Sequence, residues 1–129
     1  MTNQTMIMEW AEKAGAFPVP EQYNGKGTAE EPQCGDGLML CIQVSEFGVI
    51  DQAGFSLIAS ENPVLKAFAT YLCSSCQRRP VLACMTVEWS QTAAAFAADG
   101  ELDPADVPYA MMTEIALKKS LADYGRHFQ

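Results

Sequence analysis

Five cysteines are the residues of this sequence with the greatest capacity for chemistry: Cys34, Cys41, Cys73, Cys76 and Cys84. Residues 32–37 read PQCGDG, and glycine beside a thiol lets the backbone approach a ligand closely. Asp36 adds a carboxylate that can bind a metal or orient a proton. Tetrahedral zinc takes four ligands, and iron–sulfur clusters are usually held by four cysteines. Cys34 and Asp36 therefore amount to half of a metal site, and the alternative is a turn that carries an incidental cysteine.

Cys73 and Cys76 form a C-x-x-C pair, and Cys84 follows eight residues later. In a reducing compartment this spacing indicates a metal knuckle or a redox pair. However, no second C-x-x-C completes a zinc ribbon, and a position near the C-terminal end of a helix raises the pKa of a thiol. Three interpretations stay open for Cys73, Cys76 and Cys84: packing, a metal or cluster site, and a redox pair. Cys41 lies within an expected strand and is assigned no function.

The composition excludes several classes of protein. A length of 129 residues corresponds to one domain, 1–129, and a hydrophobic content of 49% excludes wholesale disorder. A formal net charge of −8 argues against binding to nucleic acid, because phosphates are neutralised by Lys and Arg. The same charge argues against binding to an anionic membrane surface. A single histidine makes most histidine-dependent catalysis improbable.

The sequence predicts a cytoplasmic protein that does not associate with membranes. No stretch approaches the roughly 18 apolar residues of a membrane-spanning helix. The first residues, MTNQT, lack the basic-then-apolar order of a secretory signal. Because cytoplasmic thiols stay reduced, we expect the cysteines to be free thiols, metal ligands or redox groups rather than a disulfide framework.

Helices are expected on both sides of a short extended region. The segment 18–33, rich in Pro, Gly and polar residues, indicates a loop. Apolar residues at helical spacing, bounded by caps and prolines, predict helices over residues 5–17, from Asn62-Pro63 to Pro80, over 81–98, and after Asp103-Pro104.

The extended region predicts a small antiparallel sheet. Residues 38–44 alternate between two faces, as is typical of a strand. Residues 49–58 are also extended, with Gly54 allowing a bulge or bend between two short strands. Strands followed by helices favour an α+β fold, with a three-stranded antiparallel sheet and helices packed on one face. We expect an N-terminal helix and loop in 1–33, the sheet in 34–60 and helices in 61–126.

The order of features after residue 30 matches a known pattern. Cys34-Gly35-Asp36 precedes the strand 38–44, GVIDQA at 48–53 follows with Phe55, and ALKKSLADY closes the pattern at 116–124. This order resembles the NifU/IscU-type iron–sulfur cluster scaffold family. The resemblance implies a small α+β domain that is not an enzyme, that assembles a [2Fe–2S] cluster or holds zinc, and that receives sulfur from a cysteine desulfurase.

The resemblance also implies a ligand set of three cysteines and one aspartate. Cys34 and Asp36 match the first cysteine and the aspartate. Ser60 stands at the second cysteine position, with Ala59 in place of a glycine before it, and Tyr109 stands at the third. A serine hydroxyl and a tyrosine phenol replace bridging-cluster thiolates poorly. The implied site is therefore degenerate.

We expect a scaffold-like protein of iron–sulfur cluster assembly that binds iron, zinc or a cluster, or accepts sulfur, at this degenerate site. Its expected partner is a cysteine desulfurase or another iron–sulfur assembly protein. Two alternatives stay open. One is an interaction or regulatory module that kept the scaffold fold and holds no metal. The other is a metal protein that uses Cys73, Cys76 and Cys84.

Overall fold

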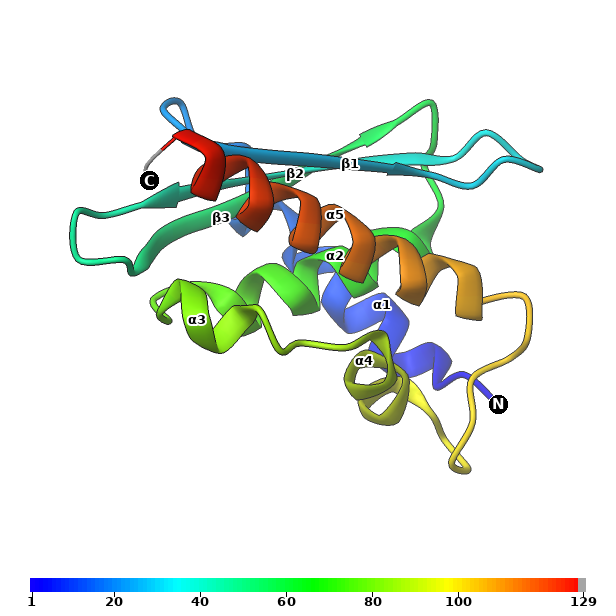
Figure 1. Cartoon of the computed structure of the whole chain (residues 1–129). Helices are drawn as coiled ribbons and strands as arrows, with labels where there is room; N and C mark the ends of the chain where they lie inside the picture. Colours follow the sequence, from blue (N-terminus) through cyan, green and yellow to red (C-terminus); the bar gives the residue numbers. More distant parts are fainter. Residues whose placement is uncertain (128–129) are drawn as a thin grey trace.

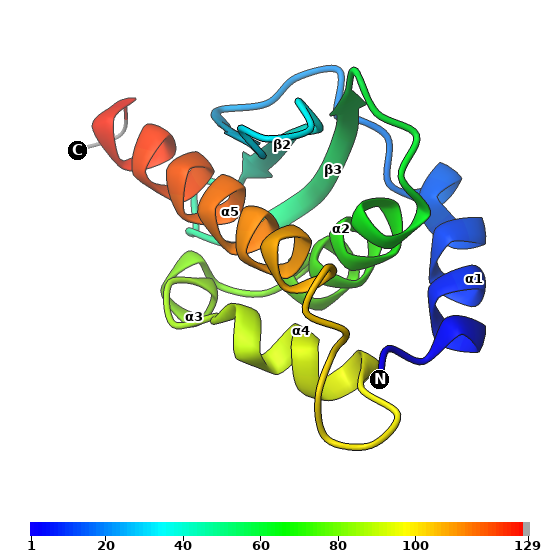
Figure 2. The same ribbon diagram turned by 90° about the vertical axis from the view of Figure 1, so that its right-hand side faces the viewer.

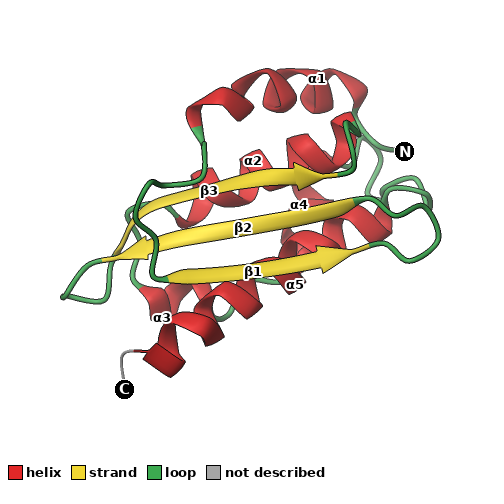
Figure 3. Cartoon of the chain, turned by 90° about the horizontal axis from the view of Figure 1, so that it is seen from above, coloured by secondary structure: helices red, strands yellow, loops and turns green. Residues whose placement is uncertain are grey.

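Three antiparallel strands form one sheet in the computed structural model, which describes residues 1–127. Their order in the sheet is β1–β2–β3 (Figure 3). The sequence predicts alternating apolar residues in β2, and the structure confirms them. The inner face of this strand carries Leu38, Leu40, Ile42 and Val44, and all four side chains are buried. The strands are β1 (Gly25–Glu30), β2 (Gly37–Val44) and β3 (Ile50–Ile58).

All helices lie on one face of this sheet (Figure 1), which confirms the α+β fold class. Figure 2 shows α2 and α5 directly beneath the strands, with α1 and α4 farther out. A second apolar cluster around Ile7, Phe68 and Phe96 joins α1, α2 and α4. In residues 1–127 no helix combines the length and apolar character needed to span a bilayer. The helices are α1 (Gln4–Glu12), the 3-10 turn η1 (Lys13–Ala16), α2 (Pro63–Cys76), α3 (Val81–Cys84), α4 (Trp89–Phe96) and α5 (Val107–His127).

The placement of the sheet within 34–60 is wrong, because β1 lies inside the segment 18–33 that the sequence predicts as a loop. The sheet therefore spans residues 25–58. The physical reason is that β1 turns only Gly25, Gly27 and Ala29 toward the helices. Its sequence therefore does not alternate between large apolar residues and polar residues.

The division of residues 49–58 into two short strands is also wrong, because β3 is continuous through Gly54. A Cβ built on Gly54 would lie 1.8 Å from the carbonyl oxygen of Pro18. The backbone N–H of Phe55 donates to the carbonyl of Phe17 at 3.1 Å. Gly54 thus permits a close approach of two backbones. The chain after η1 crosses the outer face of the sheet (Figure 3). Cys41 on β2 is fully buried.

The expected helix over 81–98 is two helices, α3 and α4, separated by residues 85–88. The hydroxyl of Thr86 donates to the carbonyl of Ala83 at 3.1 Å and closes α3. Glu88 is extended and starts α4, where its N–H donates to the side chain of Gln91 at 3.2 Å. A local turn and a new N-terminal cap thus interrupt an apolar pattern that is otherwise continuous. The expected helix over 5–17 is shorter as well, because it tightens into η1 after Glu12.

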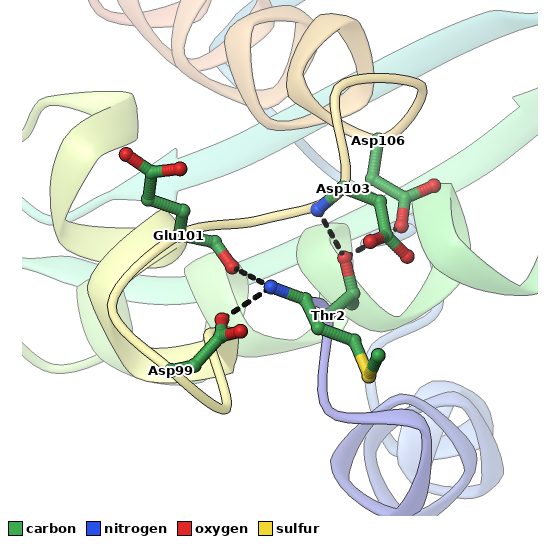
Figure 4. A network of polar contacts seen from close by, with 6 residues as sticks. Thr2, Asp99, Glu101, Asp103 and Asp106 are labelled. Carbon is green, nitrogen blue, oxygen red and sulfur yellow. Dashed lines mark hydrogen bonds and ion pairs between the residues drawn. The ribbon is translucent and has the colours of Figure 1, made fainter.

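The connection between α4 and α5 is held by the first residues of the chain (Figure 4). The hydroxyl of Thr2 donates to the Asp106 carboxylate at 2.7 Å and accepts from the Asp103 N–H at 2.9 Å. The ammonium group of Met1 pairs with Asp99. The Thr2 side chain is 1% exposed, whereas the Met1–Asp99 pair lies at the surface. The Thr2 hydrogen bonds hold the chain where it enters α5.

A second close backbone contact joins β1 to α5. A Cβ built on Gly27 would lie 2.1 Å from the carbonyl oxygen of Ala116 and 2.6 Å from the nitrogen of Ser120. A Cβ on Gly25 would lie 2.5 Å from the carbonyl oxygen of Ser120. The two backbones are therefore in direct contact, and only glycine allows this spacing.

Gly27→Ala is expected to lower the free energy of unfolding by about 3 kcal/mol, because the added methyl group overlaps the α5 backbone. Urea denaturation measures this change. Gly125→Ala is the matched control, since a Cβ there meets nothing within 4 Å. That control should gain up to about 1 kcal/mol from helix propensity. A Gly27→Ala protein as stable as its parent would show that β1 and α5 are not in backbone contact.

Candidate functional site

Four positions that are far apart in the sequence meet at one end of the sheet. Cys34 and Asp36 lie in the loop between β1 and β2, Ser60 follows β3, and Tyr109 lies in the first turn of α5. These are the four positions at which the resemblance places ligands. Cys34 is exposed, and the other three are partly buried. The structure therefore brings together every residue of the predicted site around Cys34.

Asp36 is the centre of this cluster. Its carboxylate oxygen Oδ2 accepts hydrogen bonds from the Tyr109 hydroxyl at 2.7 Å and from the Cys34 thiol at 3.1 Å. The side chain of Ser60 also hydrogen-bonds Asp36. The Cys34 sulfur and the Tyr109 oxygen lie 3.7 Å apart. Three donors from three parts of the chain thus converge on one carboxylate.

These hydrogen bonds reinforce the ordinary protonation states of Asp36 and Tyr109. Bonds from Ser60, Tyr109 and Cys34, in that order of size, lower the pKa of Asp36. The bond to Asp36 raises the pKa of Tyr109 well above its ordinary value. Asp36 is therefore a carboxylate and Tyr109 a neutral phenol at neutral pH.

Glu31 also belongs to the site, although the sequence analysis assigns it no role. Its carboxylate oxygen Oε2 accepts from the backbone N–H of Gln33 at 2.9 Å and of Cys34 at 3.2 Å, and lies 3.5 Å from the Cys34 sulfur. Its carbonyl accepts from the N–H of Gly35, which has a φ of 76°. Glu31 thus folds the loop into the turn that presents the thiol. An acidic side chain three residues before a cysteine in a glycine turn is the signal that could have identified it.

Ala59 orients Ser60 through an unusual backbone conformation. Its φ of 53° lies in the left-handed region, where an L-residue costs about 1–2 kcal/mol relative to glycine. The resemblance expects glycine at this position, and the left-handed turn supplies the physical reason. Ser60 then accepts a hydrogen bond from the Asn62 N–H at 3.1 Å, and Asn62 caps α2.

The other four cysteines do not reach this site. Cys73, Cys76 and Cys84 are each 1% exposed, and burial raises the pKa of Cys73. Among residues 1–127, no three His, Cys, Asp or Glu side chains are grouped so that they could hold a metal ion. Cys34 is the one exposed thiol in the part of the chain that the structure describes. A metal site built from Cys73, Cys76 and Cys84 stays a prediction.

The donor set around Cys34 is one thiol, the two carboxylates of Asp36 and Glu31, and two hydroxyl groups. A [2Fe–2S] cluster takes four ligands, which are mainly thiolates. The donors therefore do not match a cluster ligand set. An exposed thiol can still react with the sulfur of another protein, because thiol exchange requires that the attacking sulfur be accessible.

Comparison with known proteins identifies the fold. No family model and no curated protein matches this sequence. A NifU-like protein of Brucella abortus superposes with a TM-score of 0.64 at 11% identity, covering 94% of this chain and 92% of its own. A protein assigned as a scaffold for iron–sulfur cluster assembly in the SUF system of Fervidobacterium islandicum gives 0.59 at 11% identity, covering 91% of each chain. A hypothetical protein gives 0.51 at 13% identity, covering 95% and 96%.

Identities this low establish the fold and nothing finer. The chain has the fold of NifU-like and SufU-type scaffold proteins, over nine-tenths of its length. The resemblance predicted from the CGD motif is confirmed at this level. The ligand roles of Cys34, Asp36, Ser60 and Tyr109 stay predictions.

Tyr109→Phe removes one hydroxyl group and is expected to raise the pKa of Asp36 toward its ordinary value. A carboxyl group whose pKa is lowered by folding stabilises the fold above its unfolded pKa, and this contribution disappears as the pH falls through the folded pKa. The variant should therefore be less stable than its parent at neutral pH and equally stable in strong acid. Carbon-13 NMR titration of Asp36 and unfolding at several pH values measure both effects.

Tyr23→Phe is the matched control, because Tyr23 is 44% exposed. It should leave the Asp36 titration unchanged. An Asp36 pKa that is the same in Tyr109→Phe and in its parent would show that the phenol does not bind the carboxylate.

Proposed function

We propose that this protein acts in iron–sulfur cluster assembly as a scaffold-like protein that accepts sulfur on Cys34. The observation that carries the proposal is that three side chains, Glu31, Asp36 and Tyr109, surround one exposed thiol, in a fold that scaffold proteins share. Its partner would be a cysteine desulfurase or another iron–sulfur assembly protein, in the cytoplasm, where thiols stay reduced. The protein would be a carrier and not an enzyme.

The sulfur transfer is a thiol–persulfide exchange. The Cys34 thiolate attacks the outer sulfur of a persulfide on the donor protein, and a new S–S bond forms on Cys34. The S–S bond of the donor breaks, and its cysteine leaves as a thiolate that takes up the proton lost by Cys34. Asp36 positions the reacting sulfur, because the Cys34 thiol donates to its carboxylate in the resting protein.

The donor set favours sulfur over metal as the cargo. Cys34 and Asp36 could each contribute one bond to an iron or zinc ion, but the other two family positions hold hydroxyl groups. Hydroxyl oxygens compete poorly with thiolates for soft metals. Both Tyr109 and Cys34 already donate to the carboxylate oxygen Oδ2 of Asp36. A metal would have to displace these bonds before Oδ2 could bind it.

A second candidate function rests on the same substitutions. Ser60 and Tyr109 in place of thiols suit a regulatory module that binds an assembly protein and carries no cargo. Such a module needs no reactive sulfur on Cys34. Sulfur loading of Cys34 therefore separates the two functions.

Incubation with a persulfide-loaded cysteine desulfurase is expected to add one sulfur atom to Cys34, because this thiol alone is exposed among the described residues. Peptide mass spectrometry after alkylation measures the addition. Cys34→Ala should lose it. Cys41→Ala should keep it, since Cys41 is buried. A parent protein that gains no sulfur, or a Cys34→Ala protein that still gains it, would remove Cys34 as the acceptor and favour the regulatory module.

Anaerobic incubation with iron and sulfide is expected to leave the parent without stable visible charge-transfer bands, because its site offers one thiolate. The double variant Ser60→Cys/Tyr109→Cys supplies three thiols and Asp36, and should develop these bands. Absorption spectra and iron analysis measure the difference. Adding Cys34→Ala to the double variant should abolish the bands. Bands in the parent that depend on Cys34 would mean that the natural donor set does assemble a cluster.

A further inference from the structure

A second pair of thiols lies far from the Cys34 site, where α2 meets α3. Cys76 ends α2 and Cys84 ends α3, and their thiols are in hydrogen-bond contact. The Cys84 sulfur also lies 3.9 Å from the carbonyl oxygen of Cys76. In Figure 1, α3 lies at the opposite end of the sheet from the loop between β1 and β2. This pair therefore has no part in the chemistry proposed for Cys34.

The turn between the two cysteines is held rigidly. The N–H of Arg79 donates to the carbonyl of Cys76 at 3.1 Å. Ile50 on β3 then binds the turn from the other side, since its N–H donates to the Arg79 carbonyl at 2.9 Å and its carbonyl accepts from the Arg78 N–H at 2.6 Å. Arg78 has a φ of 70°, so these bonds hold a strained backbone. The two thiols are thus kept side by side.

A surface groove borders one of the two cysteines. Cys84 lines a groove of about 350 Å³ between α2, α3 and α4, together with Ser75, Arg79 and Gln91. A groove of this size admits small polar molecules. Cys76 lies behind Cys84 and does not line it.

The surroundings also make the two sulfurs unequal. The hydrogen bond from Cys76 lowers the pKa of Cys84, burial opposes this effect, and the positive charge of Arg79 adds to it. The same hydrogen bond, followed by burial, raises the pKa of Cys76. Cys84, which lines the groove, is therefore the thiol to which we assign the first reaction, and Cys76 is its partner.

We propose that Cys76 and Cys84 are a redox-active pair that closes to a disulfide when hydrogen peroxide enters this groove. The Cys84 thiolate attacks one peroxide oxygen, the O–O bond breaks, and a sulfenic acid forms on Cys84 while the other oxygen leaves as water after taking up the thiol proton. The Cys76 sulfur then attacks the Cys84 sulfur, and the S–O bond breaks. The second oxygen leaves as water with the Cys76 proton. Two thiols lose two electrons, and the peroxide gains them.

The tryptic map of the chain distinguishes this disulfide from its nearest competitor. Cleavage after Lys66, Arg78 and Lys118 gives the peptides 67–78, with Cys73 and Cys76, and 79–118, with Cys84. A bond between Cys76 and Cys84 joins the two peptides. A bond within the C-x-x-C pair stays inside one peptide.

The test uses the full chain with Cys34→Ser, which removes the exposed thiol. After peroxide treatment and alkylation, mass spectrometry is expected to find the two peptides cross-linked with the loss of two hydrogen atoms, and a dithiol reductant should separate them. Cys76→Ser and Cys84→Ser should each lose the cross-link, whereas the matched Cys73→Ser should keep it.

Three outcomes would overturn the proposal: no cross-link, a bond confined to the peptide 67–78, or a cross-link that survives Cys76→Ser. Circular dichroism checks that each variant is folded. If Cys76→Ser or Cys84→Ser does not fold, the Cys73→Ser protein decides, because Cys76 is then the single thiol in its peptide. Sulfur loading of Cys34 is measured separately, so either proposal can fail alone.

Discussion

The direct backbone contact between β1 and α5 is the constraint on which the candidate site depends. Gly25 and Gly27 let the helix lie against the strand with no side chain between them. The contact runs from Ser120 back to Ala116, so the first turn of α5 continues toward the loop that follows β1. Tyr109 thereby reaches Asp36 across 73 residues of sequence. A side chain at Gly27 would move the helix, and with it the phenol, away from the carboxylate.

A second consequence of this contact is that the site is assembled by tertiary structure rather than by one segment. The β1–β2 loop carries Cys34 and Asp36, the left-handed residue Ala59 orients Ser60 at the end of β3, and α5 delivers Tyr109. Each element is held independently of the site. Asn62 caps α2 directly after Ser60, and Thr2 holds the chain that enters α5. The hydrogen bonds to Asp36 therefore form between groups that the fold has already placed, and they cost little conformational entropy.

The sequence predicts the elements that depend on a local residue pattern. It does not predict the elements that depend on contacts with distant backbone. The alternation from Leu38 to Val44 is local, so β2 and the fold class followed from it. The sequence does not predict β1, because the inner face of this strand is glycine and alanine. These small residues are required by the α5 backbone that lies against them. The sequence around Gly54 indicates a bend rather than a close contact, because the carbonyl of Pro18 that Gly54 accommodates comes from a distant segment. The CGD motif indicates Cys34 and Asp36, whereas Glu31 lies outside that motif and acts by folding back onto the turn.

If Ser60 and Tyr109 stand at family ligand positions, as the resemblance implies, these substitutions change the interactions of the Asp36 carboxylate. A thiolate at either position would repel Asp36 and would need a cation between them. A hydroxyl group donates a hydrogen bond, so Ser60 and Tyr109 stabilise the carboxylate with no metal present. The same fold and the same four positions therefore form a site that is complete without a cation. In this site the Cys34 thiol contacts Asp36 and Glu31 and is exposed, and the proposed transfer of sulfur requires that exposure.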